Sequence, residues 1–207
     1  MMEIGASQVK ELRIKTGAGV MECKSALEEA RGDFERAVTI LRERGMAKAA
    51  LKAGRAAADG LIVAYVHPGG RIGVLIEVNC ETDFVARTEQ FQALSKDLAM
   101  HVAAMNPLYL RREEVPEAVL AEERRILQTQ AAGSSKAPDV VERIVQGRLE
   151  KFFVEACLMD QPFVKDPERR VEQVIQEAIS TIGENIVVRR FCRYQLGETS
   201  GEAGPTS

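Results

Sequence analysis

The sequence predicts an α+β protein in which a small bundle of three helices precedes a three-stranded antiparallel sheet backed by helices. Three observations indicate this class. The first 45 or so residues carry only helical periodicity, the next segment carries two strand patterns joined by a turn, and the chain then returns to helices before one last strand. Strands and helices that segregate along the chain, without regular alternation, are typical of the α+β class.

Residues 1–45 are expected to form the three-helix bundle. Ser7 can cap the first helix, and the glycines of residues 16–19 should stop it, because glycine adopts conformations that other residues resist. The apolar residues of the second and third helices recur at intervals of three and four, as in an amphipathic helix. They are Cys23, Ala26, Leu27, Ala30, Phe34, Ala37, Val38 and Leu41. Gly45 is expected to end the third helix and the bundle.

Residues 46–59 consist mainly of alanine and basic residues and are expected to form a linker helix. Lys48, Lys52 and Arg55 would share one face of it. Two interpretations stay open at this point. The basic stripe could meet an acidic partner or RNA, or it could be a solvated face whose charges keep the helix soluble.

Residues 60–196 are expected to form the α+β core. Residues 61–67 and 71–80 are rich in β-branched and aliphatic side chains, and Pro68 with two glycines supplies the turn between them. In the second strand apolar and polar residues alternate, which indicates a sheet with one buried side. Residues 185–196 should add the third strand.

Four further helices are expected between the second and the third strand. Their first turns are indicated by Thr88, Pro116, Asp139 and Val171. Residues 161–167 should be extended, since the residue before each proline is pushed out of helical geometry. Residues 133–138 are the clearest loop, and residues 197–207 are predicted to be a disordered tail.

The composition and net charge limit the classes of protein to which the chain can belong. The 207 residues are 45% apolar and 29% charged, which is typical of a globular protein. No apolar run approaches the roughly 20 residues of a membrane-spanning helix, and the N-terminus lacks the order of a signal peptide. A net charge of −3 gives no overall attraction to nucleic acid or to an anionic membrane. We therefore expect a cytoplasmic protein with no membrane partner and no direct nucleic-acid binding.

The sequence contains no recognisable catalytic or cofactor motif. A Gly-rich phosphate loop, a dinucleotide fingerprint, a His-Glu-x-x-His run and a nucleophile elbow are all missing. The cysteines are widely spaced, and with only two histidines they indicate no zinc site. They are Cys23, Cys80, Cys157 and Cys192, with His67 and His101. We expect no enzyme, no cofactor and no metal, although paired carboxylates among the 31 acids stay open as a catalytic alternative.

Asp83 and Phe84 lie side by side between the second strand and the helix that follows it. An acid next to an aromatic at such a corner can be a helix cap followed by a core residue. It can also be a probe aimed at a partner, because interfaces gain most of their energy from a few anchors, which are commonly aromatic. The pattern leaves both interpretations open.

Four motifs point to one family. They are residues 16–24 (TGAGVMECK), 79–85 (NCETDFV), 161–164 (QPFV) and 183–191 (GENIVVRRF). In these motifs the chain resembles the bacterial elongation factor Ts family, the guanine-nucleotide exchange factors of elongation factor Tu. The likeness covers about residues 3 to 197.

The resemblance implies that residues 1–45 form a ubiquitin-associated-like bundle that docks on the GTPase domain of elongation factor Tu. The positions that make this contact in the family match Arg13, Val20, Met21 and Lys24. Val20 and Glu22 differ from the Met and Asp of many relatives. Because position 20 is still apolar and position 22 is still acidic, we expect the contact with the GTPase domain to be retained.

The resemblance also implies roles for the corner. Thr82, Asp83, Phe84 and Val85 match the family's intruding motif. Phe84 would enter an apolar pocket between helices of the GTPase domain, and Asp83 would act near the water network of the nucleotide's magnesium ion. His101 belongs to a helix signature that helps contact the GTPase in longer members, although its place beside a buried stripe also suits a half-buried, satisfied histidine.

Longer members of the family carry two core subdomains, whereas here one core holds both signatures. This implies a homodimer in which a second copy supplies the missing half, so that the core of residues 60–196 also serves dimerisation. Cys192, on the exposed last strand, is a candidate for the dimer interface and for an interchain disulfide. The strongest alternative of another class is an RNA- or ribosome-associated module that uses the basic linker with Arg189, Arg190 and Arg193.

Overall fold

The computed structural model of the chain describes residues 4–132 and 138–198. The chain divides into two compact units, each built from separate stretches of sequence. Within the described residues, unit 1 comprises residues 4–60, 79–92 and 173–187. Unit 2 comprises residues 61–78, 93–132, 138–172 and 188–198. The predicted partition at residues 45, 59 and 196 stays a prediction.

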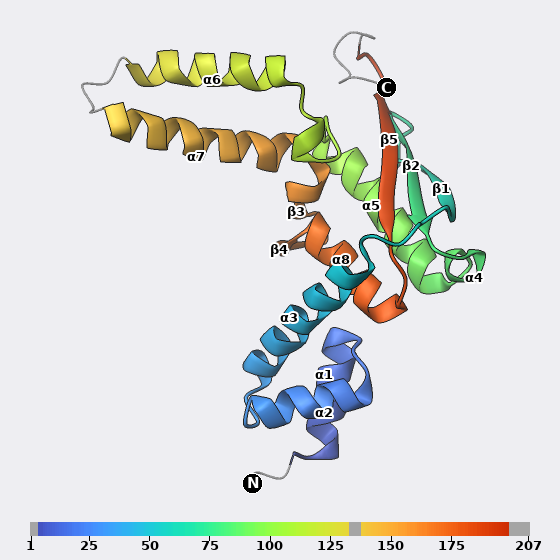
Figure 1. The fold of residues 1–207 in the computed structure, drawn as a ribbon. Helices are drawn as coiled ribbons and strands as arrows, with labels where there is room; N and C mark the ends of the chain where they lie inside the picture. Colours follow the sequence, from blue (N-terminus) through green and yellow to red (C-terminus); the bar gives the residue numbers. More distant parts are fainter. Residues whose placement is uncertain (1–3, 133–137, 199–207) are drawn as a thin grey trace. The chain divides into compact units, whose positions relative to one another are not determined.

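Unit 1 begins with a three-helix bundle (Figure 1). Its helices are α1 (Ala6–Thr16), α2 (Val20–Glu29) and α3 (Phe34–Lys52). Gly17, with a φ of 68°, ends α1 in the left-handed conformation, which confirms the predicted turn. The carboxylate of Asp33 caps α3 by accepting the N–H three residues on. The bundle core consists of Val9, Leu12, Cys23, Ala26, Leu27, Ala30, Ala37, Ile40 and Leu41.

The prediction that the third helix ends at Gly45 is wrong. Helix α3 continues through the alanine-rich segment to Lys52. Gly45 is buried within the helix, and a Cβ added there would lie 3.4 Å from the hydroxyl of Ser180 on α8 (Val171–Ile182). That distance is ordinary van der Waals contact, so Gly45 lies at a packing contact between two helices and does not end α3. The high helix propensity of alanine carries α3 onward.

The three bases predicted to share a face of the linker each have an acceptor within unit 1. They are Lys48 with Glu22, Lys52 with the Gly183 carbonyl, and Arg55 with the Glu81 carboxylate. The expectation that all three bases share one face of a helix is wrong, because α3 ends at Lys52 and Arg55 lies beyond it. The solvated interpretation stays a prediction, since the side chains of Lys48 and Arg55 are 44% and 53% exposed. A basic stripe that met RNA would first have to give up these partners.

Unit 2 holds most of a three-stranded antiparallel sheet in the order β1-β2-β5 (Figure 1). The strands are β1 (Asp59–Val66), β2 (Ile72–Cys80) and β5 (Val187–Gln195). The His67 N–H donates to the Ile72 carbonyl at 2.9 Å and closes the β1–β2 hairpin. The predicted α+β class and the pairing of the last strand with the hairpin are thus confirmed.

One face of this sheet is covered and the other is open. Val74, Ile76 and Val78 alternate along β2 and are buried, which confirms the period-two prediction. On β5, the Arg193 guanidinium donates to the Ala103 carbonyl of α5 (Glu89–Met105) at 3.3 Å. Helices therefore back the face that carries the buried side chains of β2.

The remaining helices of unit 2 include a long hairpin, in which α6 and α7 lie side by side (Figure 1). They are α6 (Glu117–Ala132) and α7 (Pro138–Ala156), with short 3-10 turns at Arg112–Glu114 and Leu158–Asp160. Leu127, Val145 and Leu149 form the core between the two helices. The loop predicted at residues 133–138 falls almost wholly outside the described residues, as does most of the tail predicted at 197–207.

The segment predicted to be extended is extended, and it also pairs with itself. Its strands β3 (Pro162–Phe163) and β4 (Asp166–Arg170) form a two-stranded antiparallel sheet. The prediction missed this pairing because two prolines so close together argue against a regular strand. In the part of the chain that the structure describes, no helix is long and apolar enough to cross a membrane.

Candidate functional site

The corner after β2 is a short capped helix in unit 1. The Thr82 hydroxyl accepts the Val85 N–H at 3.4 Å and starts α4 (Asp83–Ala86), a helix of four residues. Phe84 is 79% exposed, whereas Ala86 faces inward and is buried. The interpretation of Asp83 as the cap and Phe84 as a core residue is therefore wrong. Thr82 is the cap, and the phenyl ring lies in solvent.

Glu184 holds this corner from the other side. One of its carboxylate oxygens accepts the N–H groups of Glu81 and Thr82 at 3.1 and 3.0 Å, and the other accepts the Thr82 hydroxyl at 2.7 Å. The Glu81 carboxylate in turn accepts the Asn185 N–H at 2.6 Å. We call these four residues, Glu81, Thr82, Glu184 and Asn185, the corner clamp.

The corner clamp also reaches the segment that leaves the bundle. The Asn185 side chain, which is buried, donates to the Arg55 carbonyl at 2.8 Å. The Arg55 guanidinium lies 3.6 Å from the Glu81 carboxylate. Sequence reasoning missed the roles of Glu81, Glu184 and Asn185. The available signal was a Glu-Asn pair placed between a helix-ending glycine and an apolar strand.

Asp83 is not free in this structure. Its carboxylate accepts the Arg87 guanidinium at 2.7 Å, one helical turn further along. Such exposed pairs contribute only about 0.3–0.5 kcal/mol. The carboxylate can therefore exchange this partner for another at little cost.

The predicted docking residues lie on the outside of α1 and α2, and we call them the bundle surface: Arg13, Val20, Met21 and Lys24. Val20 and Met21 are 52% and 73% exposed. Arg13, Val20 and Lys24 line a groove of about 340 Å³, whose other walls come from Ile4, Ala6, Val9 and Lys10. The bundle surface thus combines exposed apolar side chains with cations. Sequence periodicity missed the walls formed by Ile4 and Lys10.

His101 is fully buried in unit 2 rather than half-buried as expected. The Val164 N–H donates to its Nδ1 at 3.1 Å, so the proton lies on Nε2, which is 2.9 Å from the Gln161 side-chain oxygen. The Phe163 ring stacks on the imidazole with centroids 5.8 Å apart. Residues 161–164 are therefore the segment that covers His101. Its contact with a partner stays a prediction.

Protonation of His101 is expected to destabilise the fold. Burial lowers its pKa below the ordinary 6.5, and the hydrogen bond to Gln161 raises it by less. The contribution of the neutral imidazole to the free energy of unfolding is fully present above about pH 6.5, the ordinary pKa of histidine in the unfolded chain. It is lost as pH falls toward the lower pKa of His101 in the folded chain. We expect the free energy of unfolding to drop as pH falls below about 6.5, and to drop less in His101→Gln. Urea unfolding at each pH measures this.

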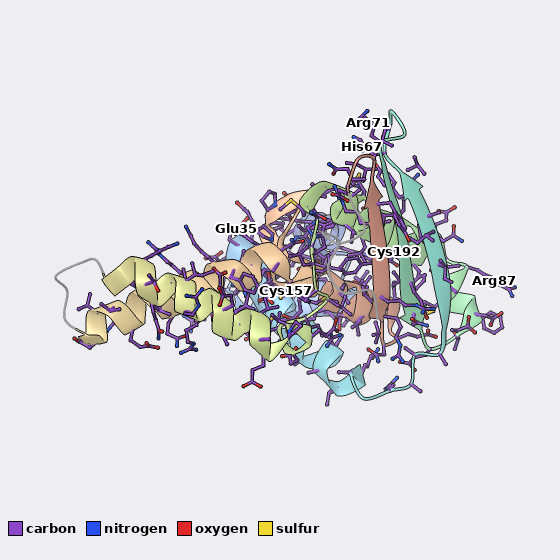
Figure 2. All side chains as sticks on the ribbon, turned by 90° about the horizontal axis from the view of Figure 1, so that it is seen from above. Glu35, His67, Arg71, Arg87, Cys157 and Cys192 are labelled. Carbon is purple, nitrogen blue, oxygen red and sulfur yellow. The ribbon has the colours of Figure 1, made fainter. Side chains whose placement is uncertain are left out.

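The control for the pH experiment is His67→Gln, because His67 lies exposed at the hairpin turn (Figure 2). This variant should keep the wild-type pH profile. Equal pH profiles for the wild type and His101→Gln would contradict the assignment.

The cysteines differ in accessibility. Cys23, Cys80 and Cys157 are buried, whereas Cys192 is partly exposed on β5 (Figure 2). Burial raises the pKa of Cys157 to about 11 and also raises the pKa of Cys80. Both thiols are therefore poor nucleophiles. Among residues 4–132 and 138–198, no group of three or more His, Cys, Asp or Glu side chains could hold a metal ion.

The open face of the sheet in unit 2 is largely apolar. The Glu77–Arg190 ion pair, at 2.7 Å, marks this face on β2 and β5. Side chains two residues away share it, which places Leu75 and Cys192 there. Together with the exposed side chains of β1 and the end of β5 they form the outer sheet face: Ile62, Val66, Leu75, Cys192 and Tyr194.

Comparison with known proteins assigns the family. The family model described as Elongation factor TS matches residues 21–198. Elongation factor Ts of Moorella thermoacetica is 58% identical over 195 residues, 94% of this chain and 96% of the relative. The Carboxydothermus hydrogenoformans and Geobacter sulfurreducens proteins of that name are 56% and 55% identical, covering 94% and 95% of this chain and 90% and 91% of their own lengths. The chain therefore belongs to the elongation factor Ts family of translation elongation factors.

Proposed function

We propose that this chain is the guanine-nucleotide exchange factor of elongation factor Tu and works in the cytoplasm. The exposure of Phe84 on a corner fixed at its base carries the proposal. An aromatic side chain held on a rigid support loses little conformational freedom when it enters a pocket. Burying such a side chain contributes about 1.5–3 kcal/mol.

The two exposed surfaces of unit 1, the bundle surface and the corner with Phe84, have different roles in exchange. The bundle surface, with Val20 and Met21 between two cations, docks on the GTPase domain. The corner then inserts Phe84 between helices of that domain. Docking supplies affinity, and insertion supplies the change in the nucleotide site.

Asp83 acts near the water network of the magnesium ion that elongation factor Tu holds with its nucleotide. To do so, the Asp83 carboxylate must break its ion pair with Arg87. This costs little free energy, because an ion pair between exposed side chains is weak. Thr82 supports this step as the helix cap, and Val85 supplies the N–H that the cap accepts. The magnesium ion belongs to the partner, so this chain needs no cofactor of its own.

Exchange follows from linkage. GDP with magnesium stabilises one arrangement of the GTPase's phosphate-binding loops, and the factor stabilises another. Each ligand must then lower the affinity of the other by the same factor, typically about 5- to 150-fold. No covalent bond is made or broken, so the chain acts by binding rather than as an enzyme. GTP then displaces the factor.

The test is the dissociation of a fluorescent GDP from elongation factor Tu, with and without this protein. We expect faster dissociation that saturates with the concentration of the factor. No acceleration at saturating concentration would contradict the proposal. Salt-sensitive RNA binding without acceleration would favour the RNA-associated alternative. That alternative would need Arg190 and Arg193, which already contact Glu77 and the Ala103 carbonyl.

We also propose that two copies associate through the outer sheet face, with Cys192 at the interface. Leu75 is 46% exposed and Tyr194 70% exposed on this face. Burying apolar side chains of this kind against a second copy favours a symmetric dimer. Sedimentation at micromolar concentration should show a dimer, and Leu75→Glu should shift it to a monomer. Cys192→Ser should remain dimeric but lose any interchain disulfide under oxidising conditions.

The matched control for the dimer experiment is Val119→Glu on α6, which is also partly exposed but lies off the sheet. A wild-type monomer with full exchange activity would contradict the homodimer.

A further inference from the structure

We infer that Glu184 is a positioning residue for exchange: through Thr82 and Glu81 it fixes the corner from which Phe84 projects. The inference rests on the proposed function and deepens it. It assigns part of the exchange activity to a residue that lies 102 positions away from Thr82 in the chain and acts through the corner.

The corner needs support from outside itself. Helix α4 has four residues, and so short a helix is not stable alone, because nucleation of the first turn is unfavourable. Its start is set by the cap residue Thr82, and the carboxylate of Glu184 holds both the hydroxyl and the N–H of that residue. Phe84 follows two residues later. The direction of the phenyl ring therefore depends on the position of Thr82.

The bonds to Glu184 are of the stronger kind. A carboxylate that accepts several N–H and O–H donors makes charge-assisted hydrogen bonds. Without Glu184, the N–H groups of Glu81 and Thr82 would lose the acceptor that the structure gives them. The Cys80 thiol, which donates to the Thr82 carbonyl at 3.1 Å, would still contact that backbone.

The corner clamp also joins the corner to the bundle. Asn185 donates its N–H to Glu81 and its side-chain amide to the Arg55 carbonyl, just beyond α3. The two neighbouring residues Glu184 and Asn185 thus hold the corner and the end of the bundle segment within one unit. A preorganised spacing between them reduces the entropy lost on binding a partner that contacts both.

The first readout uses the free protein. In Glu184→Ala, we expect the amide hydrogens of residues 79–86 to exchange with deuterium about tenfold faster. The bundle peptides should change little. The control is Glu122→Ala, which removes an exposed ion pair with Arg125 on α6 and should leave the corner unchanged. Unchanged exchange at the corner in Glu184→Ala would overturn the inference.

The second readout is the kinetics of GDP release. Glu184→Ala should lower the maximal rate about tenfold, with a change of less than about twofold in the half-saturating concentration. Glu184→Gln keeps an acceptor for the two N–H groups and should restore most of the rate. Should the alanine variant fold poorly, deuterium exchange in Glu184→Gln carries the test, because a neutral amide oxygen is a weaker acceptor than the carboxylate and the corner peptides should exchange faster than in the wild type. A rise in half-saturating concentration with an unchanged maximal rate would overturn the inference.

A double-mutant cycle separates positioning from general stability. If Glu184 acts through Phe84, then Glu184→Ala should cause no further loss of rate in a Phe84→Ala background. Additive losses would overturn the inference. Should the wild type fail to accelerate GDP release, the proposed function fails, and deuterium exchange at the corner still decides whether Glu184 positions it.

Discussion

Replacing Phe84 by alanine is expected to lower the maximal rate of GDP release about 10- to 100-fold. The ring is 79% exposed in the free chain, so its removal leaves no cavity and should change the free energy of unfolding by less than about 0.5 kcal/mol. The burial energy of the ring is realised only in the complex. Stopped-flow release of fluorescent GDP and urea unfolding measure the two quantities.

The control for Phe84→Ala is Leu51→Ala on α3, because Leu51 is 83% exposed and also belongs to unit 1. Its rate of GDP release should match that of the wild type. Wild-type rates in Phe84→Ala would remove the corner from the mechanism. A large loss of stability would instead make the ring a structural residue.

The second large effect is expected from Leu27→Ala in the bundle core. Leu27 is fully buried, and truncating such a leucine costs about 2–5 kcal/mol. A bundle of this size holds few other core residues, and small cores have little stability to spare. We expect the bundle to unfold and the half-saturating concentration in the exchange assay to rise at least about tenfold. Circular dichroism and the concentration dependence of GDP release measure this.

Met21→Ala serves as the comparison for Leu27→Ala. Met21 is 73% exposed on the same helix, so its loss should weaken docking without unfolding the bundle. An unfolded bundle in Leu27→Ala combined with an unchanged half-saturating concentration would show that the bundle surface does not dock on the GTPase.

Most of the fold could be predicted from the periodic spacing of apolar residues along the chain. The period of two in β2 and the helical stripe of α8 each depend on neighbouring residues, and the structure has both where they were expected. The prediction at Gly45 failed because a glycine can end a helix or lie inside one, and this glycine lies inside α3, where it packs beside Ser180 from a remote part of the chain. Sequence patterns contain no information on such a distant neighbour.

The candidate site shows the same limit. The pattern at Asp83 and Phe84 allowed two interpretations equally: a helix cap followed by a core residue, or a probe aimed at a partner. The exposure of the Phe84 ring excludes the core residue. Glu184 could not be placed from the sequence, because its partner Thr82 lies 102 residues earlier. His101 was expected to be half-buried, since residues 161–164, which cover it, are also remote in sequence.

Unit 1 is assembled from stretches far apart in the chain, and this sets an order for its folding during synthesis. A nascent chain that has grown only to residue 172 already contains Phe84 and the whole bundle surface, yet it lacks the third stretch of unit 1. Such a chain cannot close the corner, because the residues that hold Thr82 have not been made. We therefore expect the proposed exchange activity to appear late in translation, and a transcript truncated shortly before codon 184 should yield a product with every proposed contact residue and a poorly ordered corner.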